Sequence, residues 1–265
     1  MPIQNFDFSI LIHYSEIGLK KNNRNYFEKK FIQNISNHLK DIKHGKIHLI
    51  SARVFIDNIN PQDWEIIKSR LNNVMGLSSA LLTIKTENNI ENMKSSINYF
   101  LKNNEFDSFR VSSKRHYKGF NRTSIETNIE IGAYIQQKTK KNVVLSNPDC
   151  NFIIEILKDK NYIGYDRIIG YGGLPSATQE KALSLLSSGI DSPVASFEML
   201  KRGVNLSYIH FHSYPSVSKQ SIENTKELVK ILSKYQLQAN LYCVPLLNIQ
   251  EKIMEEIQEK YWVIF

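Results

Sequence analysis

Residues 182–195 read ALSLLSSGIDSPVA, an apolar strand that runs through a turn of small residues into a helix. Pro193 suits the first helical position and Ser192 the capping position before it. Such a turn aims backbone N–H groups at one point beside the positive end of the helix, where phosphate is the usual ligand. The stretch lacks both G-x-x-x-x-G-K-[ST] and G-x-G-x-x-G, which excludes a Walker P-loop and a dinucleotide fingerprint. The alternative is that these small residues serve packing alone.

Downstream of this turn, apolar strands alternate with amphipathic helices. Strands that are apolar throughout and separated by helices predict a parallel, doubly wound α/β sheet. Such sheets have about five strands, and three are expected here, so the ligand crevice at the reversal of strand order would have one wall. The expected strands are 182–186, 205–212 and 239–246, and the expected helices are 193–202, 221–235 and 249–262.

Two α+β segments precede the turn, and the Gly- and Pro-rich stretch 166–181 links them to it. In the first segment, residues 6–12 alternate as in a half-buried strand. Apolar residues recur every three or four positions from Phe27 to Ile42, which predicts an amphipathic helix. We expect one continuous strand at 47–57. These patterns divide the chain into domains at 1–59, 60–167 and 168–265.

The second segment repeats the alternation of helix and strand. The S/T-x-x-E spacing of Thr123 and Glu126 predicts a capping box at the start of a helix. Basic residues gather in the loop before that helix, with Tyr117 and Phe120 between them. Cations neutralise phosphates and aromatic rings stack on unpaired bases, so this loop suits RNA, although a solvated loop is the alternative. The basic residues concerned are Lys114, Arg115, Lys118 and Arg122.

The formal net charge of +8 is unevenly distributed. From Ser176 onward basic and acidic residues are equal in number, so the whole surplus lies before Ser176. Such asymmetry indicates that the first two-thirds of the chain binds a polyanion. The alternative is that genome composition favours lysine and that the surplus charge serves only solubility. A smaller basic group, Lys20, Lys21 and Arg24, lies at the entry of the first long helix and is also expected to bind RNA, with a solvated helix entry as the alternative.

The composition places the protein in a reducing compartment. Two cysteines, Cys150 and Cys243, are too few for a disulfide framework. No apolar run reaches the length of a membrane span, and the first residues have no basic n-region. We therefore expect a cytoplasmic protein without a membrane partner. Cys243 lies in an apolar strand, which predicts a buried, structural thiol.

The turn Ser187–Pro193 is similar to the S-G-G-x-D-S loop of the PP-loop ATP pyrophosphatases, in the form found in tRNA 4-thiouridine synthases of the ThiI family. Other stretches resemble the same family in the same order along the chain. They are Tyr14–Lys20, Asn23–Phe27, Lys114-Arg115, Asn147–Asp149, Gly172–Pro175 and His210–Pro215.

The resemblance implies an N-terminal ferredoxin-like domain, a THUMP domain that binds tRNA and a partial PP-loop domain. It implies ATP- and Mg²⁺-dependent adenylation of a uridine and sulfur transfer to it, giving 4-thiouridine at tRNA position eight. A cysteine desulfurase is the persulfide donor, members dimerise, and the family also serves thiamine thiazole synthesis. By position, Leu185, Leu186, His210 and Phe211 would hold adenine and ribose. The phosphates and magnesium would be held by Ser187, Ser188, Gly189, Asp191 and Ser192.

The chain departs from the family pattern in two ways. Ser188 replaces a glycine, and Ala177 and Glu180 replace small or glycine positions, so we expect weaker nucleotide binding if the turn needs positive φ. The chain stops in the apolar run 262–265, as if cut within an element. The sulfur-carrying cysteine is therefore expected beyond Phe265, and no residue of this sequence is assigned as catalytic or as a dedicated metal ligand.

Two other function classes stay open. One is a truncated, catalytically inactive THUMP protein that binds tRNA. The other is a different PP-loop enzyme, such as an amidating ligase or an adenine nucleotide hydrolase, against which the basic first two-thirds argues.

Overall fold

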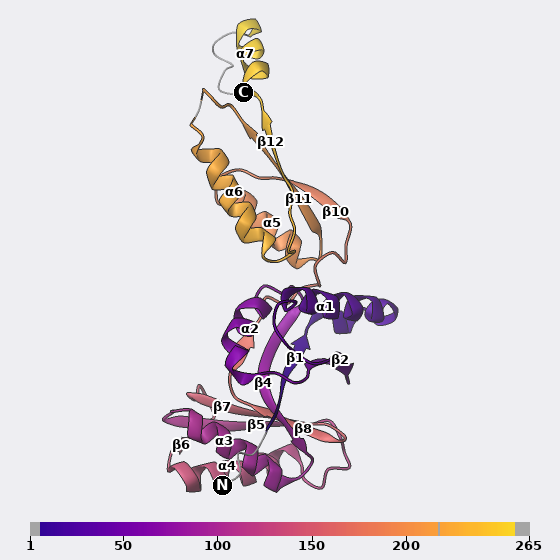
Figure 1. The fold of residues 1–265 in the computed structure, drawn as a ribbon, viewed down its shortest axis with the longest axis vertical. Helices are drawn as coiled ribbons and strands as arrows, with labels where there is room; N and C mark the ends of the chain where they lie inside the picture. The colour runs from indigo at the N-terminus through magenta and orange to yellow at the C-terminus, as the bar shows by residue number, and fades with distance from the viewer. Residues whose placement is uncertain (1–5, 217, 258–265) are drawn as a thin grey trace. The chain divides into compact units, whose positions relative to one another are not determined.

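A computed structural model describes residues 6–216 and 218–257, which form two compact units (Figure 1). Within the described residues, the first unit comprises 6–14, 35–72 and 77–170, and the second comprises 15–34, 73–76 and 171–257. Helix α1 (Arg24–His38) divides between them after Asn34. Its apolar stripe is buried as the periodicity predicts at Phe27, Phe31 and Ile35. The helix ends at His38, so the predicted continuation to Leu39 and Ile42 is wrong.

The first unit contains one mixed sheet with helices packed on it. Its described strands are β1 (Asp7–Tyr14), β2 (Ile47–Ile50), β3 (Arg53–Ile56), β4 (Leu77–Glu87), β5 (Ser108–Arg115), β6 (Asn142–Val143), β7 (Cys150–Ile156), β8 (Lys160–Gly164) and β9 (Arg167–Ile169). Its helices are the 3₁₀ turn η3 (Pro61–Asp63), α2 (Trp64–Leu71), α3 (Ile90–Asn103) and α4 (Ser124–Thr139).

Strand β4 joins the two α+β segments of this unit into one sheet. It pairs with β1 along its length, with β8 at Ile84–Glu87 and with β9 at Ser79–Leu81, always antiparallel. The strand order is β2-β3-β1-β4-β8-β7-β5-β6, with β9 also on β4. The sheet therefore continues from the first α+β segment into the second, whereas the sequence predicted strands for each segment separately.

The expected single strand at 47–57 is wrong, because the structure has a hairpin of β2 and β3 there. Ser51 and Ala52 form the tip with φ of 48° and 64°. Two successive positive φ angles are the signature of a type I′ turn, which usually carries Asn and Gly. This sequence has neither residue at the tip, so the usual signal is missing.

The second unit is built on three parallel strands in the order β10-β11-β12. Its elements are the 3₁₀ turns η1 (Glu16–Leu19) and η2 (Lys21–Asn23), then β10 (Lys181–Leu185), α5 (Asp191–Lys201), β11 (Asn205–His212), α6 (Gln220–Ser233), β12 (Leu241–Pro245) and α7 (Leu247–Glu256). The end of the expected helix at 249–262 falls outside the described residues.

Helices α5 and α6 lie on the same face of this sheet (Figure 1). That arrangement follows from two right-handed crossovers that advance in the same direction across the sheet. The core lies between the helices and the strands and includes Leu206, Tyr208 and Leu232. On the opposite face, Leu183, Leu185 and Tyr242 are exposed within the described part of the chain. The parallel α/β architecture is confirmed for these three strands.

Candidate functional site

The small-residue turn lies between β10 and α5, and Ser187–Asp191 are all exposed. Inside the turn, the Ser192 hydroxyl accepts a hydrogen bond from the Ser187 N–H at 2.9 Å, and the Gly189 N–H donates to Ser187 Oγ at 3.3 Å. The prediction that Ser192 caps the helix is wrong, because α5 already begins at Asp191 and Ser192 holds the turn closed instead. The result is an exposed, internally braced turn at the amino end of a helix, which suits an anion.

The strand end before this turn is held to β11. The Leu186 N–H donates to the Ile209 carbonyl at 2.8 Å, and Nδ1 of His210 lies 2.8 Å from the Leu186 carbonyl. Because a carbonyl only accepts, Nδ1 of His210 carries the proton in this contact. Of the residues expected to hold adenine and ribose, Leu186 and His210 are buried, whereas Leu185 and Phe211 are 68% and 40% exposed. The exposed pair is the one that a nucleotide can reach from solvent.

Ser188 and Ala177 differ in what their backbones require. Ser188 is absent from the non-glycine residues with positive φ, so this turn does not impose the strain that a replaced glycine suggested. Ala177 has φ of 59°, a conformation that costs a residue with a Cβ about 1 kcal/mol or more. The strain from these departures therefore lies at Ala177, in the stretch leading to β10, and not in the turn Ser187–Asp191.

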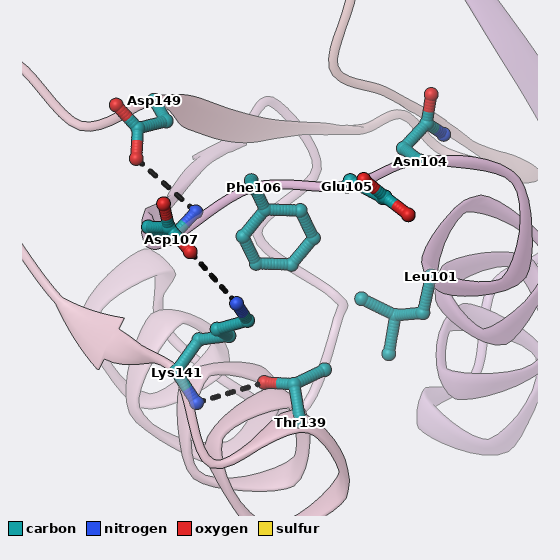
Figure 2. Close-up of a pocket in the computed structure, with 8 residues that line it drawn as sticks. All are labelled: Leu101, Asn104, Glu105, Phe106, Asp107, Thr139, Lys141 and Asp149. Atoms are coloured by element: carbon teal, nitrogen blue, oxygen red, sulfur yellow. Dashed lines mark hydrogen bonds and ion pairs between the residues drawn. The ribbon is translucent and has the colours of Figure 1, made fainter.

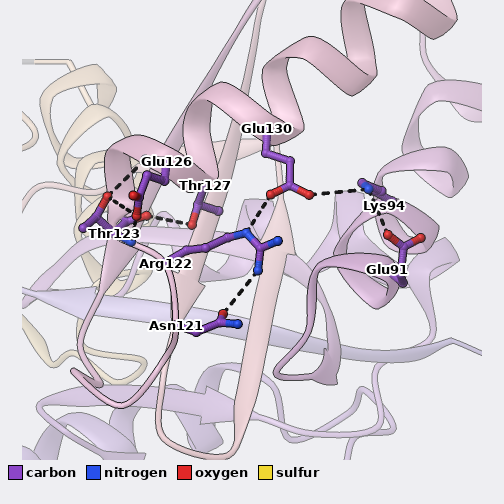
Figure 3. A network of polar contacts seen from close by, with 8 residues as sticks. All are labelled: Glu91, Lys94, Asn121, Arg122, Thr123, Glu126, Thr127 and Glu130. Atoms are coloured by element: carbon purple, nitrogen blue, oxygen red, sulfur yellow. Dashed lines mark hydrogen bonds and ion pairs between the residues drawn. The ribbon is translucent and has the colours of Figure 1, made fainter.

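In the first unit, the basic residues lie at the end of β5 and in the loop between β5 and α4, which together are called the basic loop below. The prediction that all of them lie in the loop is wrong for Lys114 and Arg115, which are the last two residues of β5. Arg115 donates from its guanidinium to the carbonyls of Phe120 and Arg122, both at 3.3 Å, so it braces the loop from inside. Arg122 forms an ion pair with Glu130 at 2.6 Å (Figure 3). Lys114 and Lys118 are exposed. The two lysines are thus the residues of this loop best placed to meet a polyanion.

The helix that follows this loop begins as its sequence predicts. Thr123 accepts a hydrogen bond from the Glu126 N–H, and the Glu126 carboxylate accepts one from the Thr123 N–H, which is the predicted capping box (Figure 3). The backbone hydrogen bond from Thr123 and that from its side chain lower the pKa of Glu126 below its usual range. The cap fixes where the basic loop ends and α4 starts.

Lys20, Lys21 and Arg24 belong to the second unit and begin the segment that leads into α1. Lys20 Nζ lies 5.1 Å from the centre of the Phe27 ring, and Arg24 pairs with Glu28 at 2.8 Å. Lys21 is exposed. Their role in RNA binding stays a prediction.

A pocket of about 690 Å³ lies in the first unit, and Figure 2 shows the eight residues that line it. Three of them are the carboxylates Glu105, Asp107 and Asp149, and the single cation Lys141 is paired with Asp107 at 2.8 Å. Hydrogen bonds from the Ser108 hydroxyl and from backbone N–H groups lower the pKa of Asp149, which keeps it charged. An acidic lining repels phosphate, so this pocket does not suit RNA.

The two cysteines have opposite environments. Cys150 is buried, and burial together with the charge of Asp149 raises the pKa of its thiol to about 12. Cys243 is exposed on β12, which makes its predicted burial wrong. Its apolar neighbours in the sequence indicated a covered strand, but the described elements do not cover β12 at Cys243.

We expect iodoacetamide at pH 8 to alkylate Cys243 in the folded protein and to leave Cys150 unmodified. Only the thiolate reacts, and a thiol with a pKa near 12 is a thiolate in about one molecule in ten thousand at that pH. Peptide mass spectrometry before and after unfolding measures both sites. Modification of Cys150 at the rate of Cys243 in the folded chain would contradict the burial seen here.

No described helix has the length and apolar character to cross a membrane. No group of three or more His, Cys, Asp or Glu side chains within 6–216 and 218–257 could hold a metal ion.

Three family models match consecutive parts of the chain. They are the ThiI ferredoxin-like domain at residues 9–80, the THUMP domain at 86–166 and the thiamine biosynthesis protein ThiI at 177–265. The matches follow one another in the order that the resemblance implied. They agree with the architecture described above, while the domain boundaries at 59 and 167 stay predictions.

Curated relatives cover nearly all of this chain. A probable tRNA sulfurtransferase of Alkaliphilus oremlandii is 36% identical over 261 residues, which are 96% of this chain and 66% of the relative. One from Thermoanaerobacter sp. (strain X514) is 34% identical, with 96% and 67% covered. The chain therefore spans about two thirds of the length of the relatives it matches.

Two solved structures are similar over most of the chain. A 4-thiouridine synthetase in complex with RNA and bound ATP has a TM-score of 0.82 at 29% identity, covering 98% of this chain and 67% of its own. PH1313 from Pyrococcus horikoshii has a TM-score of 0.77 at 25% identity, covering 94% and 82%. Both similarities extend across the first and the second unit.

Proposed function

Because this chain belongs to the tRNA sulfurtransferase family, we propose that it takes part in ATP-dependent transfer of sulfur to tRNA, giving 4-thiouridine at position eight. The observation that carries the proposal is the exposed turn Ser187–Asp191 between a parallel strand and a helix. The similar structure that holds both RNA and ATP supports the choice of substrates. Two free thiols and no disulfide agree with the reducing cytoplasm.

The RNA is bound by the first unit in this proposal. Lys114 and Lys118 lie exposed beside Tyr117, which is itself partly exposed and can stack on an unpaired base. Arg115 and Arg122 shape the loop through the contacts described above. The surplus positive charge of the chain lies before Ser176, in the part that contains this loop. A tRNA acceptor end is the polyanion that the family implies.

The ATP phosphates are bound at the turn of the second unit. A Cβ added at Gly189 would meet only Ser187 Oγ at 3.4 Å, so the turn leaves room for a phosphate beside its backbone. The hydroxyls of Ser187 and Ser192 and the carboxylate of Asp191 supply oxygen ligands of the kind that Mg²⁺ prefers. ATP bound there would supply the adenylyl group that activates the uridine oxygen. The chain's own residues bind and orient the triphosphate.

We expect Ser188→Asp to weaken ATP binding about tenfold and Ser188→Asn to leave it nearly unchanged. The two side chains have almost the same size, but the carboxylate puts a negative charge beside the phosphates. Ser188 is exposed and lacks positive φ, so both variants should fold. Equilibrium titration with ATP and Mg²⁺ measures the effect. Equal affinities of the two variants would place the phosphates elsewhere.

Sulfur delivery completes the proposal. A cysteine desulfurase supplies the persulfide, and a cysteine outside this sequence carries it, because Cys150 is buried and Cys243 does not match the family position. Dimerisation and sulfur supply for thiamine thiazole synthesis are further properties that the family implies for this chain. Thionucleoside formation on unmodified tRNA with ATP, Mg²⁺, cysteine and a desulfurase tests the step. Product that disappears in Cys243→Ser would move the sulfur carrier to Cys243.

A second function is tRNA binding without catalysis. The exposed apolar side chains of Leu183, Leu185 and Tyr242 favour this function. They lie on the sheet face opposite α5 and α6, and the described elements leave that face uncovered. The two functions differ in the ATP titration. Binding of tRNA with no measurable binding of ATP would select the second function.

A further inference from the structure

A carboxylate is buried where β7 runs through the core of the first unit. The side chain of Glu155 is 1% exposed and lies between Ile154 and Ile156. A buried carboxylate without partners is strongly unfavourable, so the residue requires a compensating set of cations or donors. Burial alone would raise the pKa of Glu155, but contacts with His13, Arg53 and His116 outweigh it and lower the pKa to about 2.

These three partners come from different parts of the sheet. Nε of Arg53 on β3 lies 3.3 Å from one carboxylate oxygen, and Nε2 of His13 on β1 lies 3.5 Å from the other. His116, directly after β5, points Nε2 at the same oxygen as Arg53. His13 and Arg53 belong to the segment that matches the ferredoxin-like domain, whereas His116 and Glu155 belong to the segment that matches the THUMP domain. Glu155 therefore ties the two segments together.

His116 also belongs to the basic loop. Its backbone N–H donates to the Ile156 carbonyl at 2.9 Å, and its ring lies against both Glu155 and the Arg53 guanidinium, with Nη2 of Arg53 2.8 Å from Nε2 and 3.1 Å from Nδ1. Because an ionised carboxylate only accepts, Nε2 of His116 donates to Glu155. Lys114 and Lys118 flank His116 two residues away on either side. The buried carboxylate thus fixes the base of the loop that presents both lysines.

We propose that Glu155 is a positioning residue for RNA binding: through His116 it holds the end of β5, with Lys114, and the loop that follows, with Lys118, in their binding orientation. A loop ordered in advance loses less conformational entropy when RNA binds. The inference rests on the proposed RNA-binding function. Glu155 is buried and negatively charged, so it favours the binding of a polyanion without touching the RNA.

Charge and position predict opposite results for Glu155→Gln. Removing a negative charge should by itself strengthen binding to RNA. If Glu155 positions the loop, the affinity for an unmodified tRNA transcript instead falls about tenfold, because the amide replaces one acceptor by a donor facing His116, Arg53 or His13. Asp159→Asn, an exposed change of equal charge just after β7, should leave the affinity equal or slightly higher. An affinity of Glu155→Gln equal to or above that of the unchanged protein would overturn the proposal.

A pair of variants at His116 decides the question even if Glu155→Gln fails to fold. The glutamine of His116→Gln can place its amide nitrogen where Nε2 donates to Glu155, whereas His116→Ala cannot. We expect His116→Gln to stay within about threefold of the unchanged affinity and His116→Ala to lose about tenfold. If the two variants lose affinity equally, His116 contacts RNA itself and the positioning role is wrong.

Hydrogen exchange separates this inference from the function on which it rests. The amides of residues 116–122 should exchange faster in His116→Ala and at the unchanged rate in His116→Gln, in the absence of RNA. If the unchanged chain does not bind tRNA, the proposed function fails, and the exchange rates still report whether Glu155 orders the loop. Unchanged exchange in His116→Ala would overturn the positioning role whatever the RNA result.

Discussion

Reversing both exposed charges of the basic loop, in Lys114→Glu with Lys118→Glu, should lower the affinity for tRNA at least about 100-fold at 0.1 M salt. Each lysine that meets a phosphate releases a counterion, so the slope of log affinity against log salt should also become shallower by about two. Arg115 and Arg122 are left unchanged because they hold the loop through Phe120 and Glu130. Filter binding or fluorescence anisotropy over a range of salt concentrations measures both quantities.

The matched control is Lys102→Glu with Lys138→Glu, which changes the net charge by the same amount. Lys138 lies fourteen residues along α4 from Ser124, roughly 20 Å from the basic loop at 1.5 Å per residue. Lys102 follows Leu101, which lines a pocket with Thr139 at that same end of α4. A separation of this size exceeds the Debye length of about 10 Å at 0.1 M salt, so the control should change the affinity less than about threefold. Equal losses in the two double variants would show that total charge, and not this loop, determines RNA binding.

The sequence predicted the elements whose signals are local. The capping box at Thr123, the apolar stripe of α1 and the strand–turn–helix around Ser187 all depend on residues within one or two turns of each other. Short-range side-chain chemistry dictates such features, so they can be inferred from a single sequence. The position of the candidate phosphate site could be predicted for the same reason.

Features that depend on partners distant in sequence could not be predicted. The sequence around Glu155 does not indicate that His13, Arg53 and His116 contact it, because these residues do not follow the periodic spacing of a helix or a strand. The hairpin tip at Ser51 and Ala52 adopts positive φ without the residues that favour it, so the surrounding strand pairing determines its conformation. The exposure of Cys243 likewise depends on which elements cover β12 and not on its apolar neighbours.

The linker before β10 gives the second large effect: Gly173→Ala should destabilise the second unit by at least about 3 kcal/mol. Gly173 has φ of 75°, and a Cβ at this position would lie 2.2 Å from the Lys201 carbonyl oxygen. That oxygen accepts a hydrogen bond from the Leu174 N–H at 2.9 Å, so relieving the overlap also breaks this contact. Left-handed strain of about 1 kcal/mol, a lost hydrogen bond of about 1 kcal/mol and the displacement of backbone against backbone contribute together.

The neighbouring glycine supplies an internal control, because Gly172 has φ of 67° but its added Cβ would meet only the Ser15 hydroxyl, at 3.3 Å. Gly172→Ala should therefore incur the left-handed strain without the backbone overlap and cost about 1 kcal/mol. Chemical denaturation followed by a probe in the second unit measures both free energies of unfolding. The difference between the two variants isolates the contact of Gly173 with the end of α5, which connects the linker to the helix that begins at the turn Ser187–Asp191. Equal losses would mean that the linker can move away from Lys201, and the position of the turn would then not depend on this contact.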